Sequence, residues 1–314
     1  MKENQPNIIV VGGLNIDLFM NVPKLPVLGE TIKGSNFFQT PGGKGANQAV
    51  ACARLGGNVT MFGKTGNDSF SELLINNLNK SGINTEFIEQ AEDHTGVALI
   101  MVDKEANNLI SFAPGANNNL STTDIDRYKE CFSKQQTLLI QNECRMETIV
   151  KSVELAKQND LKIIYNPAPA LDIDDDFIKK CDVIIPNETE AETLSGISIS
   201  DDKSLEKIAD FFINKGCETV IITLGEKGAF YKSNKEIGVV KAPTVKAIDT
   251  VAAGDTFLGA FTVEYSKDKP IQDCIRFATH AAAISVTKSG AQTSIPMYED
   301  VYNTYPILRS SNEN

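Results

Sequence analysis

The stretch Ile8-Ile9-Val10-Val11, followed at once by Gly12-Gly13-Leu14-Asn15-Ile16-Asp17, indicates the fold class. Four consecutive β-branched residues that end at glycine are typical of a strand buried on both faces, because a strand with one wet face alternates. Helical patterns lie between many of the similar apolar runs at residues 138–141, 162–165, 183–185 and 220–223. The sequence therefore predicts a three-layer α/β/α fold with a mostly parallel central sheet.

One region interrupts this alternation. Residues 95–102 and 108–113 are two β-type runs joined by Asp103-Lys104-Glu105-Ala106-Asn107, which predicts a hairpin. We expect the hairpin to lie outside the main sheet, in a small sheet that serves as a lid. Elsewhere, Ser69-Phe70-Ser71-Glu72 fits a capping box, so we expect a helix to begin there.

Composition restricts the class of protein. The 314 residues carry 30 basic and 41 acidic side chains, a net charge of -11, which argues against nucleic-acid binding. The polar N-terminus and the absence of a long apolar run predict neither a signal peptide nor a membrane span. Unpaired thiols and a cytoplasmic location are expected from the wide spacing of Cys52, Cys131, Cys144, Cys181, Cys217 and Cys274.

Two glycine-containing motifs indicate a small-molecule site. In Pro41-Gly42-Gly43-Lys44-Gly45-Ala46-Asn47-Gln48-Ala49, the glycines let backbone approach a ligand closely, while Lys44 and Asn47 add polar groups near a helix start. The lysine is followed by glycine, so this is not a Walker A loop. A plain turn before a helix is the alternative.

The second motif is Asp249-Thr250-Val251-Ala252-Ala253-Gly254-Asp255-Thr256-Phe257. Small residues lead into a helix whose first turn would hold Asp255. Unpaired N–H groups at a helix start bind anions, and a carboxylate beside them suits proton abstraction from a hydroxyl. The alternative is that Asp255 only caps the helix.

Three weaker signals follow predicted strands. Gly12–Asp17 lacks the dinucleotide-binding glycine pattern, which argues against a nicotinamide-dependent dehydrogenase, but Asn15 and Asp17 would share one side of an extended segment. Asn187 and Glu190 could order Mg²⁺ or simply begin a helix. The segment Thr223-Leu224-Gly225-Glu226-Lys227-Gly228 could line a nucleotide or form an ordinary turn.

Together these motifs resemble the ribokinase family of sugar kinases over almost the whole chain. The resemblance includes Asn166-Pro167-Ala168-Pro169-Ala170 and ends at Gly290-Ala291-Gln292-Thr293-Ser294-Ile295-Pro296. It implies one ribokinase-like domain over residues 1–314, with lid segments at about 15–40 and 95–113. The implied reaction is ATP-dependent phosphorylation of D-ribose at its 5-hydroxyl, and lid-to-lid packing would make a homodimer.

The resemblance also implies a role for each matching residue. Asp255 would be the catalytic base, and the N–H groups of Ala252, Ala253 and Gly254 would form an anion hole. The sugar would be held by Asn15, Asp17, Gly42, Gly43, Lys44, Asn47 and Glu143 together with Asp255. ATP would lie along Asn187, Thr223, Gly225, Gly228 and Gly254, with Glu190 supporting Mg²⁺ indirectly. An activating K⁺ would be held by Asp249, Ser294 and the main-chain oxygens of Val251, Ser285, Lys288 and Gly290.

Alternatives remain within and outside this resemblance. A kinase of the same family could act on 2-deoxyribose, another sugar or a nucleoside, although an amide at Asn15 can serve a hydroxyl that deoxyribose lacks. A non-catalytic sugar or nucleotide sensor is a further alternative. Thr279 stands where the family often has Asn or His, and His280 lies one place later, so we expect His280 to be a packed or surface residue.

Overall fold

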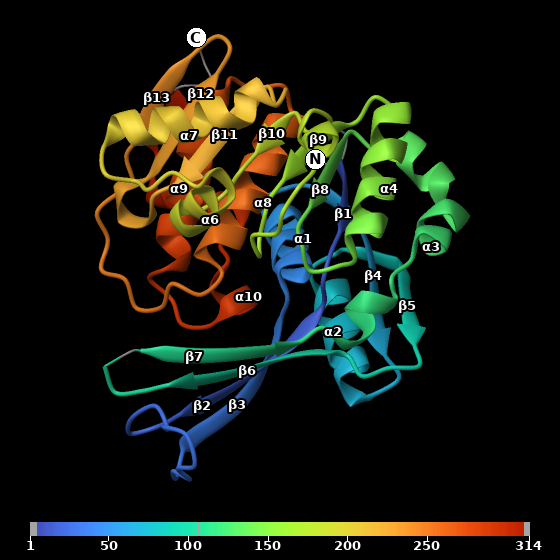
Figure 1. Cartoon of the computed structure of the whole chain (residues 1–314), viewed down its shortest axis with the longest axis vertical. Coiled ribbons are helices and arrows are strands. Elements are labelled where there is room, and N and C mark those ends of the chain that lie inside the picture. Colours follow the sequence, from blue (N-terminus) through green and yellow to red (C-terminus); the bar gives the residue numbers. More distant parts are fainter. Residues whose placement is uncertain (1–4, 106, 311–314) are drawn as a thin grey trace.

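The computed structural model describes residues 5–105 and 107–310. Its main sheet has nine strands in the order β13-β12-β11-β10-β9-β8-β1-β4-β5 (Figure 1). Pairing is parallel from β5 to β11 and antiparallel for β12 and β13. The strands are β1 (Asn7–Val11), β4 (Asn58–Gly66), β5 (Asn84–Ala91), β8 (Thr137–Ile140), β9 (Lys162–Tyr165), β10 (Val183–Ile184), β11 (Thr219–Thr223), β12 (Ala229–Ser233) and β13 (Ile237–Val240).

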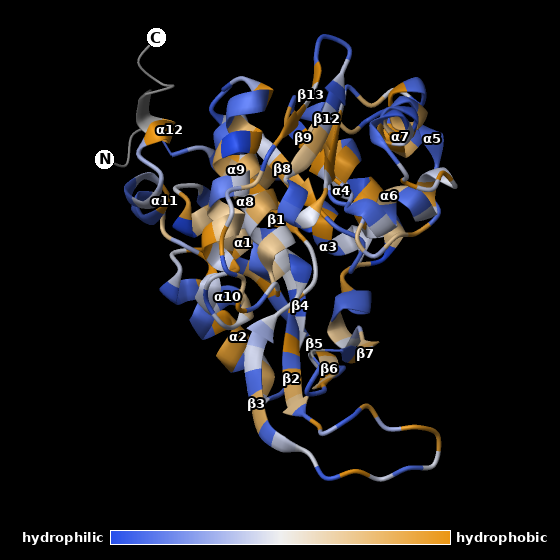
Figure 2. Ribbon diagram, turned by 90° about the vertical axis from the view of Figure 1, so that its left-hand side faces the viewer, coloured by the Kyte–Doolittle hydropathy of each residue, from blue (hydrophilic) through white to orange (hydrophobic). Residues whose placement is uncertain are grey.

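Helices cover both faces of this sheet, which confirms the three-layer prediction (Figure 2). The α-helices are α1 (Lys44–Arg54), α2 (Ser69–Lys80), α3 (Thr122–Arg127), α4 (Met146–Gln158), α5 (Asp175–Ile178), α6 (Glu188–Ser195), α7 (Asp202–Asn214), α8 (Ala253–Ser266), α9 (Ile271–Ser285), α10 (Ala291–Ser294), α11 (Tyr298–Thr304) and α12 (Ile307–Ser310). Short 3₁₀ segments are η1 (Gly115–Asn119), η2 (Lys129–Lys134) and η3 (Gly225–Lys227).

Strand β1 shows why a continuous apolar run predicted a central strand covered on both faces. It lies between β4 and β8, and Ile8, Ile9, Val10 and Val11 are all fully buried. Ile8 and Val10 join the core cluster beneath α1, α8 and α9, whereas Ile9 and Val11 join the cluster beneath α4 and α7. Each buried side chain of this size stabilises the fold by about 1.5–3 kcal/mol, so an apolar run without alternation is needed here.

The predicted hairpin lies in a second, four-stranded sheet of order β3-β2-β6-β7, outside the main one. Its strands are β2 (Asn15–Asn21), β3 (Ser35–Gly42), β6 (Gly96–Val102) and β7 (Asn108–Ala113). Figure 1 shows this small sheet projecting from the main body beside α2 and α10. The hairpin prediction is therefore confirmed, although the connection includes residue 106, outside the described residues.

The capping box predicted at Ser69 is wrong. Asp68 caps α2, because its side chain accepts hydrogen bonds from the N–H groups of Phe70 and Ser71. The same carboxylate accepts bonds from the backbone and side chain of Thr95, each 2.7 Å long. Asp68 thus joins the start of α2 to the start of β6, and Ser69 becomes the first helical residue.

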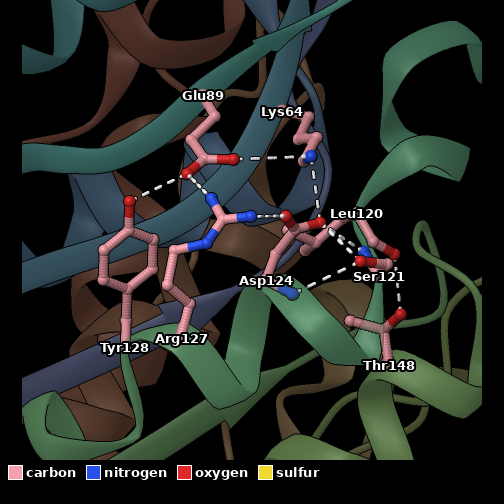
Figure 3. Close-up of polar contacts among 8 residues, drawn as sticks. All are labelled: Lys64, Glu89, Leu120, Ser121, Asp124, Arg127, Tyr128 and Thr148. Atoms are coloured by element: carbon pink, nitrogen blue, oxygen red, sulfur yellow. Dashed lines mark hydrogen bonds and ion pairs between the residues drawn. The ribbon is translucent and has the colours of Figure 1, made fainter.

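A polar cluster fixes α3 against the edge of the main sheet (Figure 3). Lys64 of β4 pairs with Asp124 at 2.9 Å, and Asp124 forms a capping box with Ser121. Glu89 of β5 accepts hydrogen bonds from Arg127 and from Tyr128. These four charged side chains neutralise one another, and the cluster serves to hold α3.

In the described part of the chain, all six cysteines are free thiols, five of them buried. None of the helices within residues 5–105 and 107–310 is long and apolar enough to cross a membrane.

Candidate active site

The site begins where α1 meets the turn between β1 and β2. Gly43 precedes α1 with φ of 90°, a conformation that L side chains avoid. A Cβ atom at Gly45 would lie 2.6–2.7 Å from backbone atoms of Gly12 and Gly13. These glycines therefore bring the first turn of α1 into direct contact with the β1–β2 turn, which places the two sequence motifs side by side.

Three predicted sugar-binding side chains meet at this junction. The backbone N–H of Lys44 donates to Oε2 of Glu143 at 2.7 Å, and Nδ2 of Asn15 lies 3.4 Å from its Oε1. The Asp17 carboxylate lies against Gly42, where a Cβ atom would come within 2.2 Å of its Oδ2. Amides and carboxylates that converge in this way provide both donors and acceptors for a polyhydroxylated ligand.

The carboxylates of the junction are electrostatically unusual. Burial, followed by repulsion from Glu143 and Asp255, raises the pKa of Asp17 to about 7. Burial likewise raises the pKa of Glu143 to about 7, although the Lys44 ammonium opposes the rise. Burial lowers the pKa of Lys44, but the carboxylates of Asp255, Glu143 and Glu190 give a net rise. Lys44 therefore balances a group of buried acids, as expected of a functional site.

Asp255 stands in the first turn of α8, as the sequence predicted, but its side chain does not cap that helix. Its Oδ2 accepts a 2.9 Å bond from Nδ2 of Asn47, and its Oδ1 accepts a 3.0 Å bond from Nε2 of Gln48. Both donors come from α1, so the carboxylate is held at the helix–helix junction beside the Lys44 group.

The N-terminus of α8 is shaped for an anion. Ala252 has φ of 60° and carries no capping side chain. Among the described residues, no acceptor is recorded for the N–H groups of Ala252, Gly254 and Asp255, and the space over Gly254 is open. The N–H of Ala253 differs, because it donates to the Thr250 carbonyl at 3.2 Å.

The residues assigned to the nucleotide follow neighbouring strands of the main sheet. Thr223 ends β11 and forms an isolated parallel bridge with Asn187. Asn187 and Glu190 form a reciprocal capping box at the start of α6. Gly225 is exposed in η3, and Gly228 ends that turn with φ of 101° against the Val240 carbonyl. The structure thus gives Asn187 and Glu190 the helix-starting role that the sequence left open.

The residues assigned to K⁺ come from two loops that are tied together. Asp249 Oδ1 accepts from Val251 N–H, and its Oδ2 accepts from Gly290 N–H at 2.9 Å. Asp249 N–H donates to Val286 O, and the Ser285 carbonyl accepts from Lys288 N–H. The buried Ser294 hydroxyl donates to the Ala291 carbonyl. The loop before α8 therefore packs on the segment after α9.

Comparison with known proteins shows the family of the chain. The model of the pfkB family of carbohydrate kinases matches residues 5–297. The chain belongs to this family. It is 42% identical over 294 residues to a ribokinase of Haemophilus influenzae, which covers 93% of this chain and 96% of that protein. It is also 38% identical over 304 residues to a deoxyribokinase of Salmonella typhi, covering 96% and 99% of the two chains.

Solved structures of the family have the same fold. The structure of Arabidopsis thaliana ribokinase complexed with ribose and ATP matches with a TM-score of 0.90 at 27% identity. The match covers 95% of this chain and 98% of that one. The α/β architecture with its additional small sheet is therefore the fold of this carbohydrate kinase family.

Sequence reasoning missed several amides that organise the site. Gln48 lies within the Pro41–Ala49 motif, where its residue type predicts no role, yet its side chain donates a hydrogen bond to Asp255. Asn117 of η1 donates to Oδ1 of Asn15 at 2.8 Å, and Gln292 donates to Oδ1 of Asn47 at 2.9 Å. His280 packs edge-on against Tyr305 and bonds to the Arg276 carbonyl, which agrees with the packed role expected for it.

Proposed function

We propose that this chain transfers the γ-phosphoryl group of ATP to the 5-hydroxyl of D-ribose, giving ribose 5-phosphate and ADP. The proposal depends chiefly on one observation. Asp255 stands in the first turn of α8, where N–H groups are unpaired, and its carboxylate interacts electrostatically with the buried carboxyls of Asp17 and Glu143. A hydroxyl held by these carboxyls would face a base on one side and a phosphate on the other.

In this mechanism Asp255 accepts the proton of the attacking hydroxyl. The hydroxyl oxygen forms a bond to the γ-phosphorus while the bond to the β–γ bridging oxygen breaks, and ADP leaves. Phosphoryl transfer depends mainly on positioning and charge stabilisation. We assign the stabilisation to the free N–H groups of Ala252 and Gly254, with Ala253 contributing if its bond to Thr250 opens. Lys44 would add positive charge on the sugar side.

We assign the nucleotide to the edge formed by Asn187, Thr223, Gly225 and Gly228. Glu190, at the start of α6 beside this edge, interacts electrostatically with Asp255 in the first turn of α8. Mg²⁺ would accompany ATP, and it supplies charge neutralisation when bound. Glu190 would support it indirectly, since one carboxylate oxygen already accepts from Asn187 N–H.

K⁺ would be held by the oxygens of Asp249, Val251, Ser285, Lys288, Gly290 and Ser294. Hard cations take oxygen ligands, and these two loops supply carboxylate, hydroxyl and carbonyl oxygens. Asp249 already ties the loops through Val251 and Gly290, which supports a role in shaping the segment that leads to Ala252.

We propose D-ribose rather than 2-deoxyribose because the orientation of Asn15 is determined. Asn117 Oδ1 accepts from the Leu14 N–H, so its Nδ2 must face Oδ1 of Asn15. The Asn15 amide therefore presents Nδ2 toward Glu143 and can donate to a sugar hydroxyl. A site built to bond a hydroxyl discriminates strongly against the analogue without it. The similar deoxyribokinase keeps 2-deoxyribose as the alternative.

We further propose that the small sheet closes over the sugar as a lid, that two copies pair through it, and that the protein acts in the cytoplasm. The lid strands carry Asn15 and Asp17 directly, so sheet and sugar pocket share residues. The free thiols agree with a reducing compartment.

The deciding experiment measures ADP release with ATP, Mg²⁺ and K⁺ for ribose, 2-deoxyribose, fructose and adenosine. We expect ribose to react fastest. Asp255→Asn should lower kcat by about 100-fold or more, because a general base contributes that much, while ribose binding measured by calorimetry stays close to normal.

Three outcomes would contradict this assignment. Another substrate reacting faster than ribose would retain a kinase but change its acceptor. Wild-type turnover in the Asp255→Asn variant would exclude Asp255 as the base, and no ADP release from any acceptor would favour the sensor alternative.

A further inference from the structure

Gln48 is fully buried, yet its side chain is hydrogen-bonded directly to the proposed catalytic base, Asp255. Its Nε2 donates to Asp255 Oδ1 at 3.0 Å and to Asn166 Oδ1 at 3.1 Å. Its Oε1 accepts a 2.6 Å bond from Nε2 of Gln141, which is also fully buried. The polar atoms of this side chain are thus fully engaged inside the protein, and none is available to a ligand.

The orientation of these amides follows from fixed backbone and carboxylate groups. The Ile185 carbonyl can only accept, so Asn166 turns Nδ2 toward it and presents Oδ1 to Gln48. An ionised Asp255 can likewise only accept, which requires the Gln48 NH₂ on that side. The remaining oxygen of Gln48 then faces the NH₂ of Gln141. The Ile185 carbonyl, acting through Asn166, and the Asp255 carboxylate therefore require the same orientation of the Gln48 amide.

The two oxygens of Asp255 consequently have different environments. Oδ1 is held by Gln48, a side chain with no exposed surface. Oδ2 is held by Asn47, which lies at the sugar side of the site and is 6% exposed. Asn47 is the partner that a sugar hydroxyl can displace or share, whereas Gln48 cannot reach the ligand.

We propose that Gln48 is a positioning residue, which fixes the Asp255 carboxylate through Oδ1 and leaves Oδ2 as the oxygen that accepts the substrate proton. The inference rests on the proposed function, since it assigns a role for Asp255 in that reaction. During transfer the proton passes from the sugar hydroxyl to Oδ2, and Gln48 keeps both of its own amide protons.

The test replaces Gln48 by methionine in the full-length protein, because Met has similar length but cannot donate a hydrogen bond. A bond to a charged group is worth about 1.5–3 kcal/mol, so we expect kcat to fall about 10- to 100-fold. The KM for ribose and its calorimetric Kd should change less than about three-fold if the sugar contacts stay in place.

Two further readouts separate positioning from loss of structure. Ribose should raise the Tm of Gln48→Met as much as it raises that of wild type, since the folded sugar site is retained. In an Asp255→Asn background, Gln48→Met should add little further loss, because both changes act through one group. Thr137→Val, which removes a buried bond to the Ser266 hydroxyl at the end of α8 opposite Asp255, should leave kcat unchanged.

Each outcome decides a separate question. If wild type shows no sugar-dependent ADP release, the proposed function fails before Gln48 is tested. If wild type is active and Gln48→Met retains its kcat, the positioning role is excluded. If Gln48→Met does not fold, Gln48→Leu replaces it, since Leu also lacks a hydrogen-bond donor and remains apolar at this buried position. Unchanged kinetics there would equally overturn the proposal.

Discussion

At the scale of single residues, the proposed sugar site destabilises the chain that contains it. The pKa of Asp17 is about 7 in the folded chain, raised by burial from an ordinary value of 3.8. At a pH between these two pKa values, Asp17 is protonated in the folded chain and ionised in the unfolded chain. The free energy of unfolding therefore falls as pH rises from about 4 to about 7, and this contribution is constant above that range.

Asp17→Asn should remove this penalty. At pH 8 the variant should have a higher Tm than wild type, because an amide of the same size needs no burial of charge. The difference in Tm should be smaller at pH 5 and should vanish below about pH 4, where Asp17 is protonated in both the folded and the unfolded wild type. Asp172→Asn, at an exposed position, controls for the change in net charge. A gain in Tm that is equal at both pH values would contradict the assignment, and ribose binding should weaken throughout.

At the scale of elements, Asp68 decides how α2 and β6 are joined. Asp68→Ala removes the cap of α2 and both bonds to Thr95. We expect the free energy of unfolding to fall by about 2 kcal/mol or more, since a cap contributes about 1 kcal/mol and bonds to a charged group add to it. Ser69→Ala is the matched control and should change stability little. Urea denaturation of both variants measures the difference, and equal losses would restore the Ser69 prediction.

The same elements show what a sequence can and cannot predict. Strand β1 was predictable because its two faces meet two cores, so every side chain had to be apolar. The glycines at positions 43 and 45 indicated that the backbone comes close to another group there. In the structure that group is the backbone of the β1–β2 turn. Gln48 was missed because its partners Asp255 and Asn166 lie 207 and 118 residues away in the chain. The cap of α2 was misassigned because local spacing fits Ser69 as well as Asp68, and only the bond to Thr95, 27 residues away, favours Asp68.

At the scale of the whole molecule, the small sheet exposes several large apolar side chains. Its outer half exposes large apolar side chains on both faces, among them Phe37, Phe38, Leu99 and Ile110. Phe38 stacks on Phe19 with ring centroids 4.9 Å apart, on the same face as Asp17. Contiguous apolar surface of this kind marks an interaction site in a soluble protein, and a second copy of the sheet would offer a complementary one.

We therefore expect the protein to sediment as a dimer at micromolar concentration, and Ile110→Asp to shift it toward monomer. Ile110 is 58% exposed in β7, so the substitution should disturb the association without disturbing the core of either sheet. Ile237→Asp is the matched control, because Ile237 is 50% exposed in β13 at the far edge of the main sheet. Sedimentation velocity separates the outcomes: a monomeric wild type, or an Ile110→Asp variant that stays dimeric, would show that the small sheet is not the interface. Because this sheet also carries Asn15 and Asp17, a monomeric variant with a raised KM for ribose would further link the association to the sugar site.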